Sequence, residues 1–98
     1  MTTWEVRASI RTEARPHPAV LTALRRSLRT HPGADVVPVT GGVGVRLLAP
    51  APTPAAAYAQ AVAVLATDVL PVLDPAALQD LQVQPVSGGP AAEHPRAA

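Results

Sequence analysis

A chain of 98 residues has room for one domain with a modest core, and its 48% of apolar residues is enough to build one. Cysteine is absent, which excludes a disulfide framework, a thiolate nucleophile and a cysteine-based metal site. The net charge is only +1, but arginines gather in residues 1–33 and acidic residues in 34–98, a polarity that would attract an anionic partner or a second copy.

Secretion and membrane insertion are both disfavoured. The start of the chain lacks the basic and then apolar build of a signal peptide. The longest uncharged run, 47–67, is interrupted by Pro50, Pro52 and Pro54, which is not typical of a membrane span. We therefore expect a soluble cytoplasmic protein with no membrane segment.

The first predicted element is a strand over 4–11, in which apolar and other side chains alternate. The apolar set, expected to face the core, is Trp4, Val6, Ala8 and Ile10. The other set, expected on an open face of the sheet, is Glu5, Arg7, Ser9 and Arg11. A helix is predicted over 19–30, with Pro18 in its first turn and His31-Pro32-Gly33 at its end. Its apolar stripe consists of Val20, Leu21, Leu24 and Leu28.

Two strands follow over 35–40 and 43–49, joined by a Gly41-Gly42 hairpin in which both glycines would accept a positive φ. Pro38 cannot donate a ladder hydrogen bond, so the first of these strands is expected at an edge of the sheet. The phase of this strand stays open, because its valines do not alternate cleanly with other residues.

A second helix is predicted to begin at Thr53-Pro54, where a hydroxyl cap precedes a proline, and to end near Leu70, before Pro71. The residues expected to face the sheet are Tyr58, Val62, Leu65 and Val69. Asp74-Pro75 should open a short helical turn through Leu78, and 81–86 should form the last strand. Residues 88–98 carry no apolar period, so we expect one domain over 1–87 and a disordered tail.

A weak internal repeat determines the predicted fold. Val6-Arg7-Ala8 aligns with Val45-Arg46-Leu47, and each copy is followed by prolines and a helical run. A strand-helix-strand unit used twice gives the order β-α-β-β-α-β. We therefore predict an α+β fold: a ferredoxin-like two-layer sandwich with an antiparallel sheet of order 4-1-3-2 and both helices on one face.

The second helix is unusual because no charged residue occurs between Thr53 and Thr67. A helix on the outside of a small domain normally carries a charged face. The residues left for directions away from the sheet are small or apolar: Ala55, Ala59, Ala63, Val64 and Ala66. They predict a homo-oligomer interface, although codon bias toward alanine in a GC-rich genome would explain the same composition.

Arginines form two candidate anion sites. Arg7 and Arg46 occupy matching repeat positions and should be neighbours on the open sheet face, with Arg11 and Glu5 nearby. The second candidate is the basic edge of the first helix, formed by Arg25, Arg26 and Arg29. The element order resembles that of RNA-recognition domains, but the stacking aromatic residues and the motif of those domains are absent from this face. The other interpretation is a solvated face with an Arg–Glu pair, or a sheet-to-sheet dimer.

Signals for catalysis are poor. His17, His31 and His94 lack metal-ligand spacing, and the glycines of 41–44 lack the lysine of a phosphate-binding loop. We therefore predict no catalytic residue, no metal and no cofactor. The element order and size also resemble those of dimeric α+β barrel proteins, which implies a pocket near Tyr58 or Trp4 that holds a histidine or a carboxylate.

The leading interpretation is a soluble, non-catalytic binding or assembly module that forms a homo-oligomer. A dimer is favoured, and the ligand and any protein partner are unidentified. Two alternatives are kept: a nucleic-acid or anion-binding module that uses the arginines above, and a cofactor-free enzyme of the dimeric α+β barrel type.

Overall fold

The computed structural model describes residues 2–31 and 33–86. The predicted tail, 88–98, therefore lies outside the described residues. The elements in chain order are β1 (Thr2–Thr12), α1 (Pro18–Ser27), β2 (Asp35–Val39), β3 (Gly42–Ala51), α2 (Pro54–Val64), a π-helical turn η1 (Leu65–Val69), α3 (Leu70–Leu73) and β4 (Ala76–Pro85).

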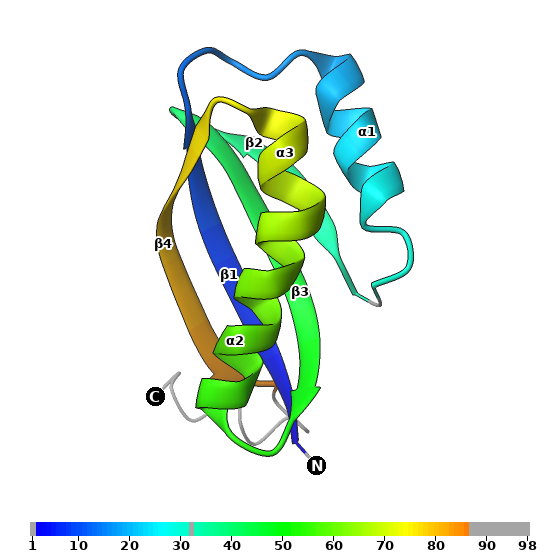
Figure 1. The fold of residues 1–98 in the computed structure, drawn as a ribbon, viewed down its shortest axis with the longest axis vertical. Helices are drawn as coiled ribbons and strands as arrows, with labels where there is room; N and C mark the ends of the chain where they lie inside the picture. The colour runs from blue at the N-terminus through cyan, green and yellow to red at the C-terminus, as the bar shows by residue number, and fades with distance from the viewer. Residues whose placement is uncertain (1, 32, 87–98) are drawn as a thin grey trace, which may run out of the picture.

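The four strands form one antiparallel sheet in the order β2-β3-β1-β4. β1 is central and pairs with β3 on one side and with β4 on the other, so that Arg7 lies between Arg46 and Gln82. The helices cover one face of this sheet and leave the other face open (Figure 1). The α+β class and the edge position of the strand that carries Pro38 are thus confirmed.

The core fills the space between the sheet and the helices. Val6, Ala8 and Ile10 of β1 are at most 4% exposed, which confirms the alternation predicted for this strand. Leu24 and Leu28 cover them from the first helical segment. Trp4 is only half-buried, and its indole Nε1–H donates to the Ala51 carbonyl at 3.0 Å, at the end of the β1–β3 ladder.

The β2–β3 hairpin turns at Thr40-Gly41, one residue earlier than predicted. Only Gly41 has a positive φ, of 82°. Gly42 already belongs to β3, and a Cβ there would lie 1.9 Å from the Ile10 carbonyl oxygen. Glycine is therefore needed at Gly42 for the close approach of two strands.

The burial of the valines of β2 shows which side of this strand faces the core, a point that the sequence left open. Val36 is 1% exposed and faces the core, whereas Val37 and Val39 are 47% and 45% exposed on the open face. This phase places Val37 opposite Gly44, where the missing side chain leaves room for both exposed valines.

α1 ends at Ser27, earlier than the predicted Thr30. His17 is its N-cap: Nδ1 accepts a hydrogen bond from the Ala19 N–H at 3.0 Å. The predicted stripe is confirmed, because Leu24 and Leu28 are buried and Val20 and Leu21 pack partly against the core.

The second helix does not stop at Pro71, contrary to the prediction. It passes through η1, where the Leu70 N–H bonds the Leu65 carbonyl five residues back, and continues as α3 to Leu73. A proline lacks an N–H and clashes with the carbonyl four residues before it, and a widened turn just upstream accommodates it.

The predicted sheet-facing set of this helix is confirmed for Leu65 and Val69 and wrong for Tyr58 and Val62. The residues that face the sheet are Ala57, Ala61, Leu65 and Val69, all at most 1% exposed. Tyr58 and Val62, predicted to be inward, are 46% and 36% exposed. Alanine at the sheet-facing positions lets the helix lie close to the strands.

The last strand is longer than predicted and replaces the helical turn expected at Asp74-Pro75. β4 begins at Ala76, opposite Thr12, and runs to Pro85, opposite Trp4, with a register shift near Ser9 and Ile10. Pairing with β1 thus prevails over the helix propensity of Ala76, Ala77 and Leu78.

Candidate functional site

The open sheet face brings together the residues that the repeat predicted. Arg7 and Arg46 lie directly opposite each other on β1 and β3, and both are exposed. Asp35 of β2 is opposite Arg46, and Gln82 of β4 is opposite Arg7, so one row of polar side chains crosses all four strands. The matched positions of the two arginines are therefore confirmed as neighbours.

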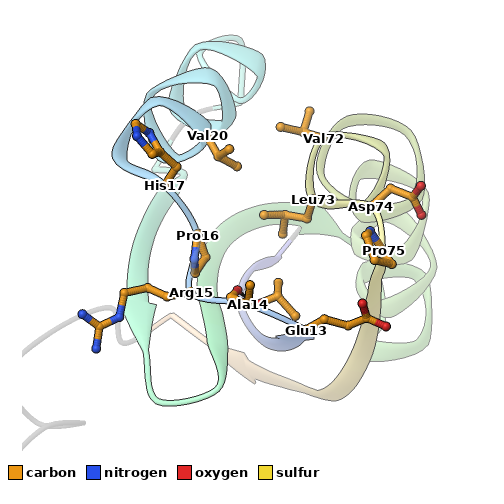
Figure 2. Close-up of a pocket in the computed structure, with 11 residues that line it drawn as sticks. Glu13, Ala14, Arg15, Pro16, His17, Val20, Val72, Leu73, Asp74 and Pro75 are labelled. Atoms are coloured by element: carbon orange, nitrogen blue, oxygen red, sulfur yellow. Dashed lines mark hydrogen bonds between the residues drawn. The ribbon is translucent and has the colours of Figure 1, made fainter.

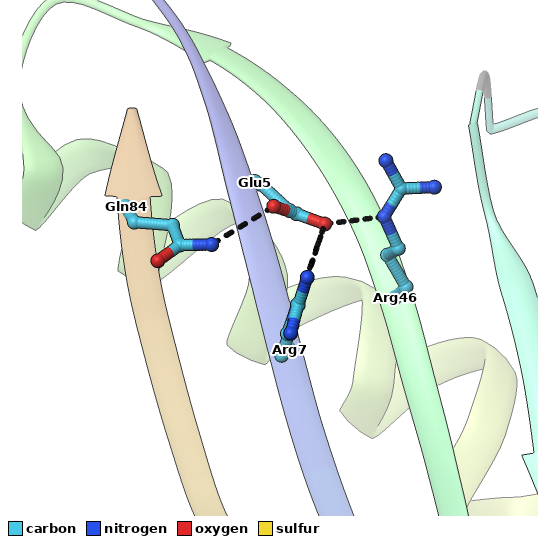
Figure 3. A network of polar contacts seen from close by, with 4 residues as sticks. All are labelled: Glu5, Arg7, Arg46 and Gln84. Atoms are coloured by element: carbon cyan, nitrogen blue, oxygen red, sulfur yellow. Dashed lines mark hydrogen bonds and ion pairs between the residues drawn. The ribbon is translucent and has the colours of Figure 1, made fainter. Parts of the chain in front are cut away.

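Glu5 is the centre of a polar network on this face (Figure 3). Its Oε2 accepts hydrogen bonds from Nε of Arg46 and from Nε and Nη2 of Arg7, the latter two at 3.4 Å. Its Oε1 accepts from Nε2 of Gln84 at 2.9 Å. The hydrogen bonds from Arg46 and Gln84, together with the charge of Arg7, lower the pKa of Glu5 to about 2.

This network has the geometry of a cross-strand staple. Glu5 occupies donors of both Arg7 and Arg46, and Asp35 and Asp80 stand at neighbouring positions of the same face. The carboxylate of Glu5 partly neutralises both guanidinium groups, which weakens their attraction for an incoming phosphate. Arg11 lies on this face as predicted, opposite Gly42 and Ala77, at the far end from Glu5.

A shallow depression of about 280 Å³ adjoins the network, over Gly44. Arg7 and Arg46 line one part of it, and Ser9, Asp35 and Val37 line the rest. Its walls therefore carry both signs of charge beside an apolar side chain, which gives a ligand of either charge no clear advantage.

The second arginine cluster lies on the other side of the sheet. α1 covers the face opposite the Glu5 network, so Arg25, Arg26 and Arg29 do not join Arg7 and Arg46 in one site. Nη2 of Arg25 donates to the Val36 carbonyl at 3.1 Å and so ties α1 to β2. Arg26 and Arg29 are exposed at the end of the helix, where cations complement the helix dipole.

A cleft of about 260 Å³ opens between the β1–α1 loop and the junction of α3 with β4 (Figure 2). Its walls are largely apolar, with Val20, Val72 and Leu73 among them. Glu13 and Asp74 lie on the Pro75 side and His17 on the opposite side, while the Arg15 guanidinium points away. Sequence reasoning did not predict this cleft, because two segments about 60 residues apart form it.

The chemistry of this cleft is limited. Nδ1 of His17 is used by the helix cap, and within 2–31 and 33–86 no hydrogen bond joins His17 to Glu13 or Asp74. The pocket expected near Tyr58 or Trp4 is not this one, and Tyr58 is on the surface. Among the described residues, no three His, Asp or Glu side chains lie together as a metal site would require.

The outer surface of α2 and η1 carries most of the residues that were predicted to form an interface. Ala55, Ala59, Ala63 and Ala66 are exposed, whereas Val64 is half-buried toward β3. Tyr58 and Val62 join the exposed set, and sequence reasoning had placed them inward. By length and composition alone the helix over 54–73 is apolar enough to cross a membrane. Of its most apolar stretch of 18 residues, 28% is buried inside the protein.

Comparisons with protein-family models, with curated proteins and with solved structures find no match to this chain.

The three surfaces differ in what they offer a partner. The open sheet face pairs its own charges, and the end cleft is small and open. The helix surface leaves Tyr58 and Val62 exposed to water in a segment, 54–67, that carries no charged residue.

Proposed function

We propose that this chain is a non-catalytic assembly module that works as a homodimer, soluble in the cytoplasm, and that the exposed surface of α2 contributes to its interface. The observation that carries the proposal is the exposure of Tyr58 and Val62, 46% and 36%, on a helix with no charged residue from 54 to 67. Burying apolar surface contributes roughly 25 cal/mol per Å², so covering these side chains favours association.

The same surface suits a second copy of the chain. Ala55, Ala59, Val62 and Ala66 follow each other at spacings of four, three and four residues, which keeps them on one side of the helix. In a two-fold dimer the same surface of both copies contributes to the interface, and a surface without charge brings no like charges together.

We also infer that the fold is ferredoxin-like. The elements β1, α1, β2, β3, the α2–η1–α3 helix and β4 follow the β-α-β-β-α-β order, and the sheet read from β4 runs 4-1-3-2. Small domains of this kind gain stability from association, because 98 residues bury a limited core.

The test is the molar mass in solution, measured by size-exclusion chromatography with light scattering over a wide concentration range. We expect the wild type at about twice 10.1 kDa and a Val62→Arg variant near 10.1 kDa. Thr22→Arg adds the same charge to an exposed position of α1 and should leave the dimer intact.

Two outcomes would overturn this function. One is a wild type of 10.1 kDa at every concentration. The other is binding of the monomer to lipid vesicles, checked by flotation, which would assign the helix surface to a membrane. Far-UV circular dichroism of both variants distinguishes loss of the dimer from loss of the fold.

A further inference from the structure

The two edges of the sheet are built differently. β2 has five residues and contains Pro38 and Asp35, a length and composition that discourage pairing with another strand. β4 has ten residues, no lysine or arginine, and no proline before Pro85; its one charged residue is Asp80. Natural edge strands are usually shorter or protected by charges.

Within the described part of the chain, β4 pairs only with β1, so its outer backbone groups face away from the sheet. These groups are strong hydrogen-bonding donors and acceptors, and the partner that satisfies a whole row of them is another strand. A register shift next to Ser9 interrupts β4 before Asp80, and the regular segment 80–85 is the template for such a strand.

Apolar side chains extend along this edge on the helix side. Leu78, Leu81 and Val83 of β4 pack against the core but are only partly buried. On α2, Gln60 and Val64 face β3, because the Gln60 amide donates to the Pro50 carbonyl and both line a cavity with β3 residues.

Tyr58 and Val62 lie on the other side of that helix, which is the side of β4. Helix geometry places them about 160° around the axis from Gln60 and Val64, and Figure 1 shows α2 crossing the sheet between β3 and β4. An apolar strip therefore runs from the exposed side of α2 down to the unpaired edge of β4.

We propose that β4 pairs with β4 of a second copy, antiparallel, so that two four-stranded sheets join into one sheet of eight strands. This inference rests on the proposed self-association and names its surface. A two-fold axis perpendicular to the sheet keeps both helix layers on the same side. Tyr58 and Val62 of each copy then close over the junction above the paired strands.

The sequence of β4 selects a register for this pairing. With Gln82 at the two-fold axis, Leu81 faces Val83 of the second copy on the helix side, and Asp80 faces Gln84 of the second copy on the open side. This register joins apolar with apolar and a carboxylate with an amide. A register centred on Asp80 would instead place two carboxylates together.

The test uses the absence of native cysteine. A Gln82→Cys variant carries one thiol, at an exposed position, and opposite residues of antiparallel strands lie close enough for a disulfide. Val37→Cys is the matched control on β2, at a position 47% exposed on the same sheet face. Under mild oxidation we expect Gln82→Cys to form a linked dimer at least about tenfold faster than Val37→Cys.

Each combination of results separates the two proposals. A wild-type dimer by mass with fast linkage at 82 supports both. A wild-type dimer with equal linkage rates at 82 and 37 overturns the β4 pairing and leaves self-association standing. A wild type that is monomeric at every concentration overturns both, whatever the linkage rates. Circular dichroism of the reduced variants confirms that each is folded before oxidation.

Discussion

At the residue scale, Glu5 holds three strands together through one carboxylate. It accepts from Arg46 on β3, from Arg7 on β1 and from Gln84 on β4, so each bond crosses to a different side chain of the sheet face. The side chain of Glu5 is only 12% exposed, whereas those of Arg7 and Arg46 are 63% and 50% exposed. Solvent around the arginines screens the ion pairs and limits what they contribute to stability.

The lowered pKa of Glu5 makes the stability depend on pH in a defined window. The folded protein holds the pKa of Glu5 at about 2, against an ordinary value of 4.5, so the unfolded chain binds the proton first as pH falls. The stabilisation is complete above pH 4.5 and is lost between there and pH 2. For Glu5→Gln we expect a loss of about 1 kcal/mol in the free energy of unfolding at pH 7, after allowance for screening.

The measurement is urea unfolding at pH 7, 4 and 2.5. The difference between wild type and Glu5→Gln should shrink as the pH falls through this window. Glu13→Gln removes an exposed carboxylate of the β1–α1 loop and serves as control. An undiminished difference at pH 2.5 would show that the network does not act through the charge of Glu5.

Two glycines of β3 make a matched pair for a second residue-scale prediction. A Cβ at Gly42 would lie 1.9 Å from the Ile10 carbonyl oxygen, so Gly42→Ala forces β1 and β3 apart. A Cβ at Gly44 would meet its nearest atom, Cγ2 of Val37, at 3.4 Å. We expect Gly42→Ala to cost about 2 kcal/mol or more, and Gly44→Ala to cost about 0.5 kcal/mol or less, as thermal unfolding would measure. Equal costs would contradict this account of the close strand approach.

At the element scale, two polar contacts join η1 to α1 and to the loop that follows α1. The Ser27 hydroxyl donates to the Asp68 carbonyl at 3.0 Å, and His31 Nε2 lies 3.0 Å from Oδ2 of the same residue. A widened helical turn changes the hydrogen bonding of its carbonyls, and the Asp68 carbonyl finds its donor on another helix. The two helices are therefore held in register at the π-helical turn.

Removing the Ser27 hydroxyl tests this link. We expect Ser27→Ala to lower the free energy of unfolding by about 1 kcal/mol, because a part-buried carbonyl loses its partner. Thr30→Ala removes an exposed hydroxyl of the following loop and should change little. If urea unfolding gives both variants the same stability, the contact does not hold α1 to the long helix.

How much of each element could be predicted depends on how much contrast its sequence carries. β1 and α1 alternate apolar with charged residues, so Val6 and Leu24 are buried as predicted. α2 is apolar on every side, so the spacing of its apolar residues does not decide which side faces the sheet, and the predicted stripe through Tyr58 and Val62 is wrong. Alanine occupies sheet-facing positions because it lets the helix pack closely against the strands, and the composition of the helix alone does not reveal this packing.

The same reasoning applies to the candidate site. The matching positions of Arg7 and Arg46 followed from the repeat, and so did the nearness of Glu5 to an arginine. The predicted sheet order placed the last strand at an edge, but the length of that edge was not predicted, because the strand was expected to begin at 81 and begins at Ala76. The helix propensity of Ala76, Ala77 and Leu78 favoured a helical turn in the prediction, whereas in the structure these residues pair with 10–12, far away in the sequence.

At the scale of the whole molecule, association and stability are coupled. If the dimer buries Tyr58 and Val62, mass action stabilises the folded chain as protein concentration rises. We expect the Tm to increase by several degrees over a hundredfold rise in concentration, and Val62→Arg to abolish that increase. Differential scanning calorimetry measures both. A Tm independent of concentration in the wild type would contradict a dimer that is linked to folding.

The central place of β1 also has a consequence for biosynthesis. The strand is made early, yet its neighbours at Arg7 are Arg46 and Gln82, which are translated 39 and 75 residues later. A nascent chain therefore carries β1 without either neighbour until the hairpin is complete, and without β4 until the long helix has been made. Of the four described strands, the last to leave the ribosome is therefore the one whose free edge would meet the second copy.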